Sequence, residues 1–238
     1  MPAAPIHLGS IPADRARRVA TAVYRILRDS TATDEVVIAE EITAQEQLRF
    51  WLREGIFETE EGRRLWSERP EISETDLDSL RALPDGALGR EFARFLDDQS
   101  ISLAGLAQGT PFTDGEEESY LMRRIRQCHD LWHVLLGVGT RGHEEVLVHC
   151  FSVAQTGFPY SLMVIGLGSL KHMVLEGRWN TLRHDTRAAW RSGANAKPIL
   201  GIFWEDRWSQ PLETVRHELG IEVIGTTFPK DRQRSLTA

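Results

Sequence analysis

The stretch His129-Asp130-Leu131-Trp132-His133 stands near the end of a helix that the spacing of apolar residues predicts over residues 117–136. Residues four positions apart in a helix lie roughly 40° apart around its axis, so the two histidines can direct their imidazoles at one point. The glycine-rich residues 137–142 predict a helix stop and a turn, and Glu145 follows early in the next predicted helix. If the two helices pack antiparallel, the carboxylate of Glu145 lies at the same level along the helix axes as the two imidazoles and close to them.

Helical periodicity recurs along the rest of the chain, and it decides the predicted fold class. Further helices are predicted over residues 15–28, 40–55, 60–68, 73–80, 88–97, 144–154, 160–175, 180–192 and 212–219. Only the short apolar run 199–204 could form a strand, and it has no clear partner. We therefore expect an all-α protein, a single-domain multi-helix bundle over residues 1–238 with little or no strand. Residues 1–11 and 230–238 are predicted to be flexible ends.

Composition narrows the classes of function. The chain has 238 residues and a formal net charge of -7, which argues against nucleic-acid binding, because phosphate backbones are held by clustered lysine and arginine. Two cysteines, Cys128 and Cys150, provide no disulfide framework and are typical of a reducing compartment. Residues 1–10 lack the apolar run of a signal peptide, so we expect a cytoplasmic protein whose mature chain starts at residue 1 or 2.

Residues 150–170 form a run without formal charge, and this run is as long as a membrane-spanning helix. The segment Gln155-Thr156-Gly157-Phe158-Pro159 interrupts this run in its middle. We interpret the run as two buried helices joined at a kink, and a short element that dips into a membrane is the alternative. Side chains such as Phe158 and Met163 can line an apolar tunnel for a ligand, or they can form an ordinary core.

Two imidazoles with one or two carboxylates form a ligand set for a divalent metal. Zn(II) suits it, and so do Fe(II) and Mn(II). Asp130 occupies the position of the general base in a His-Glu-x-x-His helix, and it can ligate, orient a water molecule or act as a base. Glu144 competes with Glu145, but its side chain points roughly 100° away, so we expect only one of them to ligate. A histidine pair at this spacing also occurs by chance, and His149, one turn after Glu145, is either a further ligand or a core residue.

Arg126 and Arg123 share the polar side of the same helix. A guanidinium beside a metal can hold a carboxylate or a phosphate of a substrate through two hydrogen bonds. The alternative is that each arginine pairs with acidic side chains such as those of residues 116–118. The sequence pattern leaves both interpretations open.

These residues resemble a known family. The runs 124–133 and 154–159, together with Glu145, are similar to the coenzyme Q biosynthesis protein 4 family. Its hallmark is His-Asp-x-x-His, eleven residues and Glu, followed by a Gln-Thr-Gly-x-Pro segment, and every position is filled here. The likeness extends to residues 83–89 upstream and 204–221 downstream, and the chain looks like a bacterial member.

The resemblance implies a mostly helical fold and a metal site at His129, Asp130, His133 and Glu145, for which Zn(II) is our first expectation. It also implies oxidative removal of the C1 carboxyl of a polyprenylated hydroxybenzoate, with a hydroxyl left in its place. In this account Asp130 and Arg126 are catalytic. The predicted substrate-binding residues are Arg123, Arg126, Gln155, Phe158 and Met163.

Two other functions fit the same residues. The protein can be a lipid-binding scaffold that organises quinone-biosynthesis enzymes, with a structural metal, or a metal-dependent hydrolase that uses Asp130 as its base. The expected partners are a prenylated quinone precursor, other quinone-biosynthesis enzymes, the inner face of a membrane as a peripheral contact, and a second copy in a homodimer.

Overall fold

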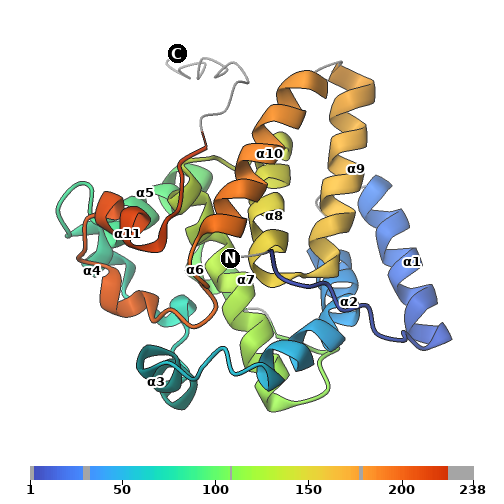
Figure 1. Cartoon of the computed structure of the whole chain (residues 1–238), viewed down its shortest axis with the longest axis horizontal. Helices are drawn as coiled ribbons and strands as arrows, with labels where there is room; N and C mark the ends of the chain where they lie inside the picture. The colour runs from blue at the N-terminus through green and yellow to red at the C-terminus, as the bar shows by residue number, and fades with distance from the viewer. Residues whose placement is uncertain (1–2, 29–32, 108, 177–178, 225–238) are drawn as a thin grey trace.

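The computed structural model describes residues 3–28, 33–107, 109–176 and 179–224, and these residues form helices joined by loops and turns (Figure 1). The α-helices are α1 (Ala13–Arg28), α2 (Thr33–Arg53), α3 (Glu60–Glu68), α4 (Leu77–Arg81), α5 (Leu88–Gln99), α6 (Leu103–Leu106), α7 (Glu116–Leu136), α8 (Gly142–Thr156), α9 (Pro159–Glu176), α10 (Trp179–Asn195) and α11 (Leu212–Leu219). Two 3₁₀ helices, η1 (Ile72–Glu74) and η2 (Trp204–Arg207), complete the set. Within the described ranges no strand forms, and one isolated bridge joins Ala87 to Pro211. The predicted all-α fold is confirmed.

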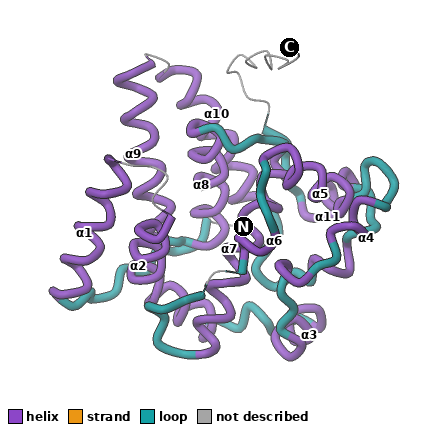
Figure 2. The backbone as a smooth tube through the Cα atoms, turned by 180° about the vertical axis from the view of Figure 1, so that it is seen from behind, coloured by secondary structure: helices purple, strands orange, loops and turns teal. Residues whose placement is uncertain are grey.

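Helices α8, α9 and α10 stand side by side and form one half of the molecule, with α1 and α2 along the flank of α9 (Figures 1 and 2). Helices α4, α5 and α11 gather on the opposite side, and α7 runs between the two groups. The contact between α8 and α10 is close, since a Cβ atom added to Gly193 would lie 2.6 Å from the backbone oxygen of Phe151. Helix α7 is therefore covered on several sides and forms the centre of the fold.

The core contains large aromatic side chains from both groups of helices. Trp132 of α7, Phe151 of α8, Phe92 of α5 and Trp204 of η2 are at most 2% exposed. The rings of Trp132 and Phe151 lie 6.3 Å apart, which fixes the last turns of α7 against α8. Burying an aromatic side chain of this size contributes about 2–3 kcal/mol, so this contact holds the two helices that carry the motif residues in register.

The turn between α8 and α9 confirms the kink predicted at residues 155–159. Gly157 ends α8 with a φ of +68°, a conformation that glycine adopts without strain. The backbone oxygen of Thr156, which lies in the last turn of α8, accepts hydrogen bonds from Gln47 Nε2 at 2.8 Å and from Trp51 Nε1 at 2.7 Å. A Cβ atom at position 157 would lie 2.2 Å from the backbone oxygen of Pro5, so the N-terminal segment also packs on this turn.

The described helices do not include one that is both long enough and apolar enough to cross a membrane. The uncharged run is thus divided between α8, which is largely buried, and the first part of α9, where Leu162 is 40% exposed. The sequence interpretation of two helices separated at a kink holds for these residues.

Several predicted elements need correction. Residues 199–204 form no strand but a turn that leads into η2, and Ile199 and Ile202 are buried because they pack on the core. The helix predicted over 73–80 is divided into η1 and α4, and α2 begins at Thr33 rather than at residue 40. The short helix α6, which Ser102 caps by accepting from Gly105 N, was not predicted. Residues 3–11 make contacts such as Ala4 N to Ala154 O at 2.8 Å, and the predicted flexible tail 230–238 lies outside the described residues.

Candidate metal centre

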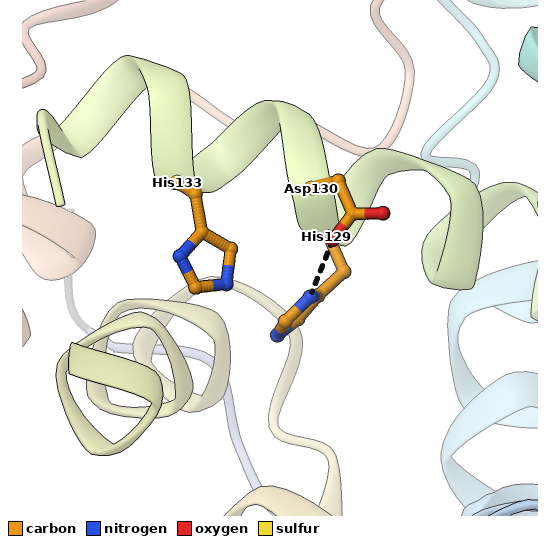
Figure 3. Close-up of side chains that lie close together, drawn as sticks. All are labelled: His129, Asp130 and His133. Atoms are coloured by element: carbon orange, nitrogen blue, oxygen red, sulfur yellow. Dashed lines mark ion pairs between the residues drawn. The ribbon is translucent and has the colours of Figure 1, made fainter. Parts of the chain in front are cut away.

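His129 and His133 project from the same side of α7, as their spacing predicts (Figure 3). Their ring centroids are 4.9 Å apart. Gly137 ends the helix one turn later with a φ of +70°, and the chain then turns back so that the backbone oxygen of Gly139 lies 2.8 Å from His133 Nδ1. This contact sets the His133 tautomer with hydrogen on Nδ1, which leaves the lone pair on Nε2.

Glu145 of α8 faces the same nitrogen atoms. Its Oε2 lies 3.5 Å from His133 Nε2 and 3.7 Å from His129 Nε2. Both Nε2 atoms are buried and have no hydrogen-bond partner among the described residues. Metal bonds of about 2.0–2.1 Å at tetrahedral angles place ligand atoms about 3.4 Å apart, so each of these two distances is close to the spacing of ligands around one ion. An orphaned buried nitrogen is costly, and a bound cation would satisfy both.

The neighbouring Glu144 has a different role. Its Oε2 accepts a hydrogen bond from the backbone N–H of Arg141 at 3.1 Å and caps the start of α8. The capping position turns Glu144 away from the histidines, whereas Glu145, one residue later, faces them. The structure thereby distinguishes Glu145, which the sequence analysis favoured, from its rival Glu144.

Asp130 lies on the other edge of His129. Its Oδ1 is 3.6 Å from His129 Nδ1, the nitrogen opposite the one that faces Glu145 (Figure 3). His129, Asp130 and His133 nevertheless form one group whose ligand atoms all lie within 4.8 Å of one another. A second such group consists of His129, Glu145 and His149. The predicted residues are therefore brought together, and His149 is brought to them.

Charge around the imidazoles is dominated by carboxylates. Burial alone would lower the pKa of His129, but the contact with Asp130 and the charge of Glu145 outweigh it and raise that pKa to about 9. Burial opposes ionisation of Glu145, yet His133 and His129 hold the pKa of that carboxyl below its usual value. Burial and the charge of His129 lower the pKa of His149 to about 3, so this imidazole is neutral at pH 7. His129 is thus protonated at pH 7, and a divalent cation would have to displace this proton to bind between the same carboxylates.

Arg126 does not present an unpaired charge to the site. Its Nε donates to Glu40 at 3.1 Å and its Nη2 to Glu41 at 2.8 Å, and both glutamates belong to α2. Arg123 donates to Glu71 at 3.0 Å. The alternative of ion pairing thus describes both arginines, but the partners are not the acidic residues 116–118 that we named.

Comparison with known proteins gives the family. The model of the family described as coenzyme Q (ubiquinone) biosynthesis protein Coq4 matches residues 6–225, nearly the whole chain. The chain belongs to the Coq4 family. The resemblance found in the sequence is therefore confirmed.

Relatives from animals and a bacterium agree with this assignment. The mitochondrial ubiquinone biosynthesis protein COQ4 homolog of Danio rerio is 36% identical over 222 residues, which cover 92% of this chain and 80% of the relative. The homolog from Homo sapiens is 35% identical over 225 residues, or 93% of this chain and 80% of the relative. A Nostoc punctiforme protein assigned to ubiquinone biosynthesis has a crystal structure with a TM-score of 0.69 and 26% identity, and the match covers 86% of this chain and 97% of that one.

The remaining predicted substrate-binding residues, Gln155, Phe158 and Met163, have different surroundings. Gln155 cross-links α8 to α10, because its Nε2 donates to Gly193 O at 2.5 Å and its Oε1 accepts from Ile199 N at 3.2 Å. Phe158 is buried in the core, and Met163 is half-buried on α9. Gln155 and Phe158 thus have structural contacts of their own, and of the three Gln155 and Met163 keep partly accessible side chains. Substrate binding by these residues stays a prediction.

Sequence reasoning missed residues that come from other helices. Glu40 of α2 interacts electrostatically with both His129 and Tyr160, and burial raises the pKa of Glu40 despite the nearby Arg126. The ring of Tyr160 lies 5.8 Å from that of His149. The signal in the sequence was the pair Glu40 and Glu41 within the mostly apolar residues 36–42, but nothing local connects this pair to the motif.

Proposed function

We propose that this Coq4-family protein is a metal-dependent enzyme of ubiquinone biosynthesis that replaces the C1 carboxyl of a polyprenylated hydroxybenzoate with a hydroxyl. The observation that carries the proposal is the pair of buried Nε2 atoms of His129 and His133, which lack partners and face one oxygen of Glu145. Family membership supports a role in ubiquinone biosynthesis, and this cluster supports a metal-dependent reaction.

The ligand set bears on the choice of metal. Two histidines and one carboxylate suit Zn(II), Fe(II) or Mn(II), and the same set with open positions is typical of non-haem Fe(II) oxygenases. The proposed reaction breaks the bond between the ring and the carboxyl carbon, releases CO₂ and forms a carbon–oxygen bond, which oxidises the ring carbon by two electrons. In this proposal dioxygen is the oxidant and supplies the hydroxyl oxygen, and its second oxygen atom leaves as water with two protons and two electrons from an external reductant. A bound metal would supply a Lewis acid for the carboxylate, and Fe(II) or Mn(II) could also exchange electrons, which Zn(II) cannot.

The surrounding residues support binding of an acidic head group with an apolar tail. Arg126 is fixed beside the cluster by Glu40 and Glu41, so in this proposal it steers the substrate carboxylate by exchanging one glutamate for it. Asp130, whose carboxylate lies beside His129 Nδ1, holds the proton of that imidazole. The uncharged first part of α9, with Leu162 exposed and Met163 half-buried, offers apolar surface for a prenyl chain.

Deletion of the gene in a host that makes ubiquinone with it tests the proposal. We expect the strain to lose ubiquinone and to accumulate a prenylated precursor that still carries its carboxyl, as detected by mass spectrometry of the lipids. Reintroducing the wild-type gene should restore the profile. An unchanged quinone profile, or accumulation of a precursor that has already lost the carboxyl, would contradict the assignment.

The scaffold alternative makes a different prediction for one variant. If the protein only organises other enzymes, Glu145→Gln should support normal quinone levels as long as it folds. The catalytic proposal predicts that the same variant is produced at the wild-type level and accumulates the carboxylated precursor.

A further inference from the structure

Two neighbouring glutamates of α2 hold Arg126, and they differ in how easily each can leave it. We propose that Glu40 is an internal competitor that the substrate carboxylate displaces from Arg126, and that Glu41 is a positioning residue that keeps the guanidinium in place throughout. The proposal rests on the carboxylate-binding role that the function proposed above gives to Arg126.

Glu41 is fixed on both of its oxygens. Its fully buried Oε1 accepts from Arg126 Nη2 at 2.8 Å, and its Oε2 accepts from the backbone N–H of Phe112 at 2.9 Å. Phe112 is itself held, because its backbone oxygen accepts from Gln45 Nε2 and the guanidinium of Arg18 lies 4.6 Å from its ring centroid. Movement of Glu41 away from Arg126 would leave a buried charge and a backbone donor without partners, which is costly.

Glu40 is bound more loosely to the same guanidinium. Its Oε2 accepts from Arg126 Nε at 3.1 Å, and none of the described residues donates a hydrogen bond to its Oε1. The side chain of Glu40 is 17% exposed, so its carboxylate can turn toward solvent and stay charged. The loss of one hydrogen bond at a partly exposed position costs less than the separation of a fully buried pair. Glu40 is therefore the glutamate that a competing anion displaces.

The position that Glu40 occupies on Arg126 lies next to the candidate metal centre. Arg126 precedes His129 by three residues on α7, so the two side chains lie roughly 60° apart around the helix axis. Glu40 acts electrostatically on His129 and on Tyr160 of α9. A substrate carboxylate that replaced Glu40 would thus be held by Arg126 beside the metal-binding residues.

Competition from Glu40 distinguishes the acid from its decarboxylated product. The acid offers Arg126 a carboxylate in exchange for that of Glu40. Once this carboxyl has left as CO₂, the product offers no anion, and Glu40 returns to the guanidinium. The affinity for the acid is lowered by the fraction of time that Glu40 occupies Arg126, whereas the affinity for the product is independent of it.

Equilibrium binding of two synthetic ligands to the purified full-length protein tests the inference. The acid is 3-farnesyl-4-hydroxybenzoate, and 2-farnesylphenol is the same molecule without its carboxyl. By isothermal titration calorimetry, Glu40→Gln should bind the acid about 10-fold more tightly than the wild type does, because the competing charge is gone. Glu41→Gln should bind the acid about 10-fold more weakly, because Arg126 loses a fixed partner. We expect neither variant to change the affinity for the phenol.

Glu46→Gln is the matched control. Glu46 belongs to the same helix but pairs with Arg49 and Arg53 at the surface, so its replacement should change neither affinity. Circular dichroism identifies a variant that fails to fold. Glu40→Met, which keeps the side-chain length without the charge, then replaces Glu40→Gln, and Glu41→Asp, which shortens the contact with Arg126, replaces Glu41→Gln.

The outcomes separate the inference from the function on which it rests. Unchanged or weaker binding of the acid by Glu40→Gln would overturn the inference, and so would an equal gain in affinity for the phenol. Tighter binding of the acid by Glu41→Gln would show that Glu41 also competes with the substrate and would overturn its positioning role. Wild-type affinity for the acid in Arg126→Gln, or no binding of the acid by the wild type, would overturn the carboxylate-binding role of Arg126 as well. The reaction itself is tested separately by the lipids of the deletion strain.

Discussion

The carboxylate oxygen of Glu145 lies 3.5 Å from Nε2 of His133, although the two residues stand on different helices. Between them the chain ends α7 at Gly137, turns, and caps α8 with Glu144. The relationship depends on this short connection and on the packing of Trp132 against Phe151. Local sequence and core packing together thus bring one carboxylate to two imidazoles.

Replacement of Glu145 should abolish function, whereas the same change at Glu144 should not. Glu145→Gln removes the anionic oxygen that faces both Nε2 atoms, and we expect loss of the ability to restore ubiquinone in the deletion strain. Glu144→Gln keeps an oxygen that can accept from Arg141 N, so we expect near-normal quinone levels. Lipid analysis of the two strains checks the prediction. Equal quinone levels in both would show that the carboxylate of Glu145 is not required.

The buried ion pair between Arg124 and Glu205 should matter for stability. Arg124 donates to both oxygens of Glu205, at 2.5 and 2.8 Å, and its side chain is 3% exposed. Glu205→Gln leaves the buried guanidinium without a counter-charge, and we expect the free energy of unfolding to fall by about 3 kcal/mol. The exposed pair of Arg81 and Asp97 is the control, and Asp97→Asn should cost about 0.5 kcal/mol. Urea denaturation measures both, and similar losses would contradict the prediction.

Gly157 should not tolerate a side chain. Its φ is +68°, and a Cβ atom there would lie 2.2 Å from Pro5 O, so we expect Gly157→Ala to lower the free energy of unfolding by about 3 kcal/mol. Gly86 has a φ of +82° with no atom within 4 Å of its Cβ position, and Gly86→Ala should cost only about 1 kcal/mol. The difference between the two losses of stability reports the crowding of this position by Pro5 O and by Gln47 Nε2, which would lie 2.8 Å from the added Cβ atom. Equal losses would mean that neither residue packs closely on this turn.

The cysteines should be unreactive in the folded protein. Burial raises the pKa of Cys128 to about 11 and that of Cys150 to about 12, so at pH 8 the reactive thiolate is at most on the order of one part in a thousand. We expect Ellman's reagent to modify neither thiol in the native state and both after denaturation. Rapid modification of the native protein at pH 8 would contradict the burial of these residues. The thiolate fraction rises with pH, so any slow reaction should accelerate toward pH 10.

The elements that could be predicted from the sequence are those fixed by local spacing. The relation between His129 and His133 is a property of one helix, and the glycine after α7 indicated the turn that brings Glu145 back. The kink at Gly157 could also be predicted, because it depends on the glycine itself and on Pro159 nearby. Helix spacing alone did not decide between Glu145 and Glu144, because that depends on which carboxylate caps the helix, and the family resemblance selected Glu145.

The misplaced features depend on distant parts of the chain. The position of Arg126 beside the motif suggested a substrate-binding role, but the residue pairs with Glu40 and Glu41 of α2. The packing of α2 on α7 could not be predicted from any local sequence pattern. Residues 199–204 are apolar enough for a strand, yet they are apolar because Ile199, Ile202 and Trp204 fill the core beside α7 and α8. His149 was one turn from Glu145 in the sequence, and only its distance to His129 gives it a place in the site.

The metal content of the purified protein, determined by elemental analysis beside that of His133→Ala, tests the central claim most directly. His133 is fully buried and contributes one of the two unpartnered Nε2 atoms, so its removal should eliminate the metal. We predict about one Fe, Mn or Zn ion per wild-type chain and a loss of nearly all of it in the variant, with circular dichroism showing the helices intact. Absence of a stoichiometric metal from the wild type, or the same content in both proteins, would contradict the account.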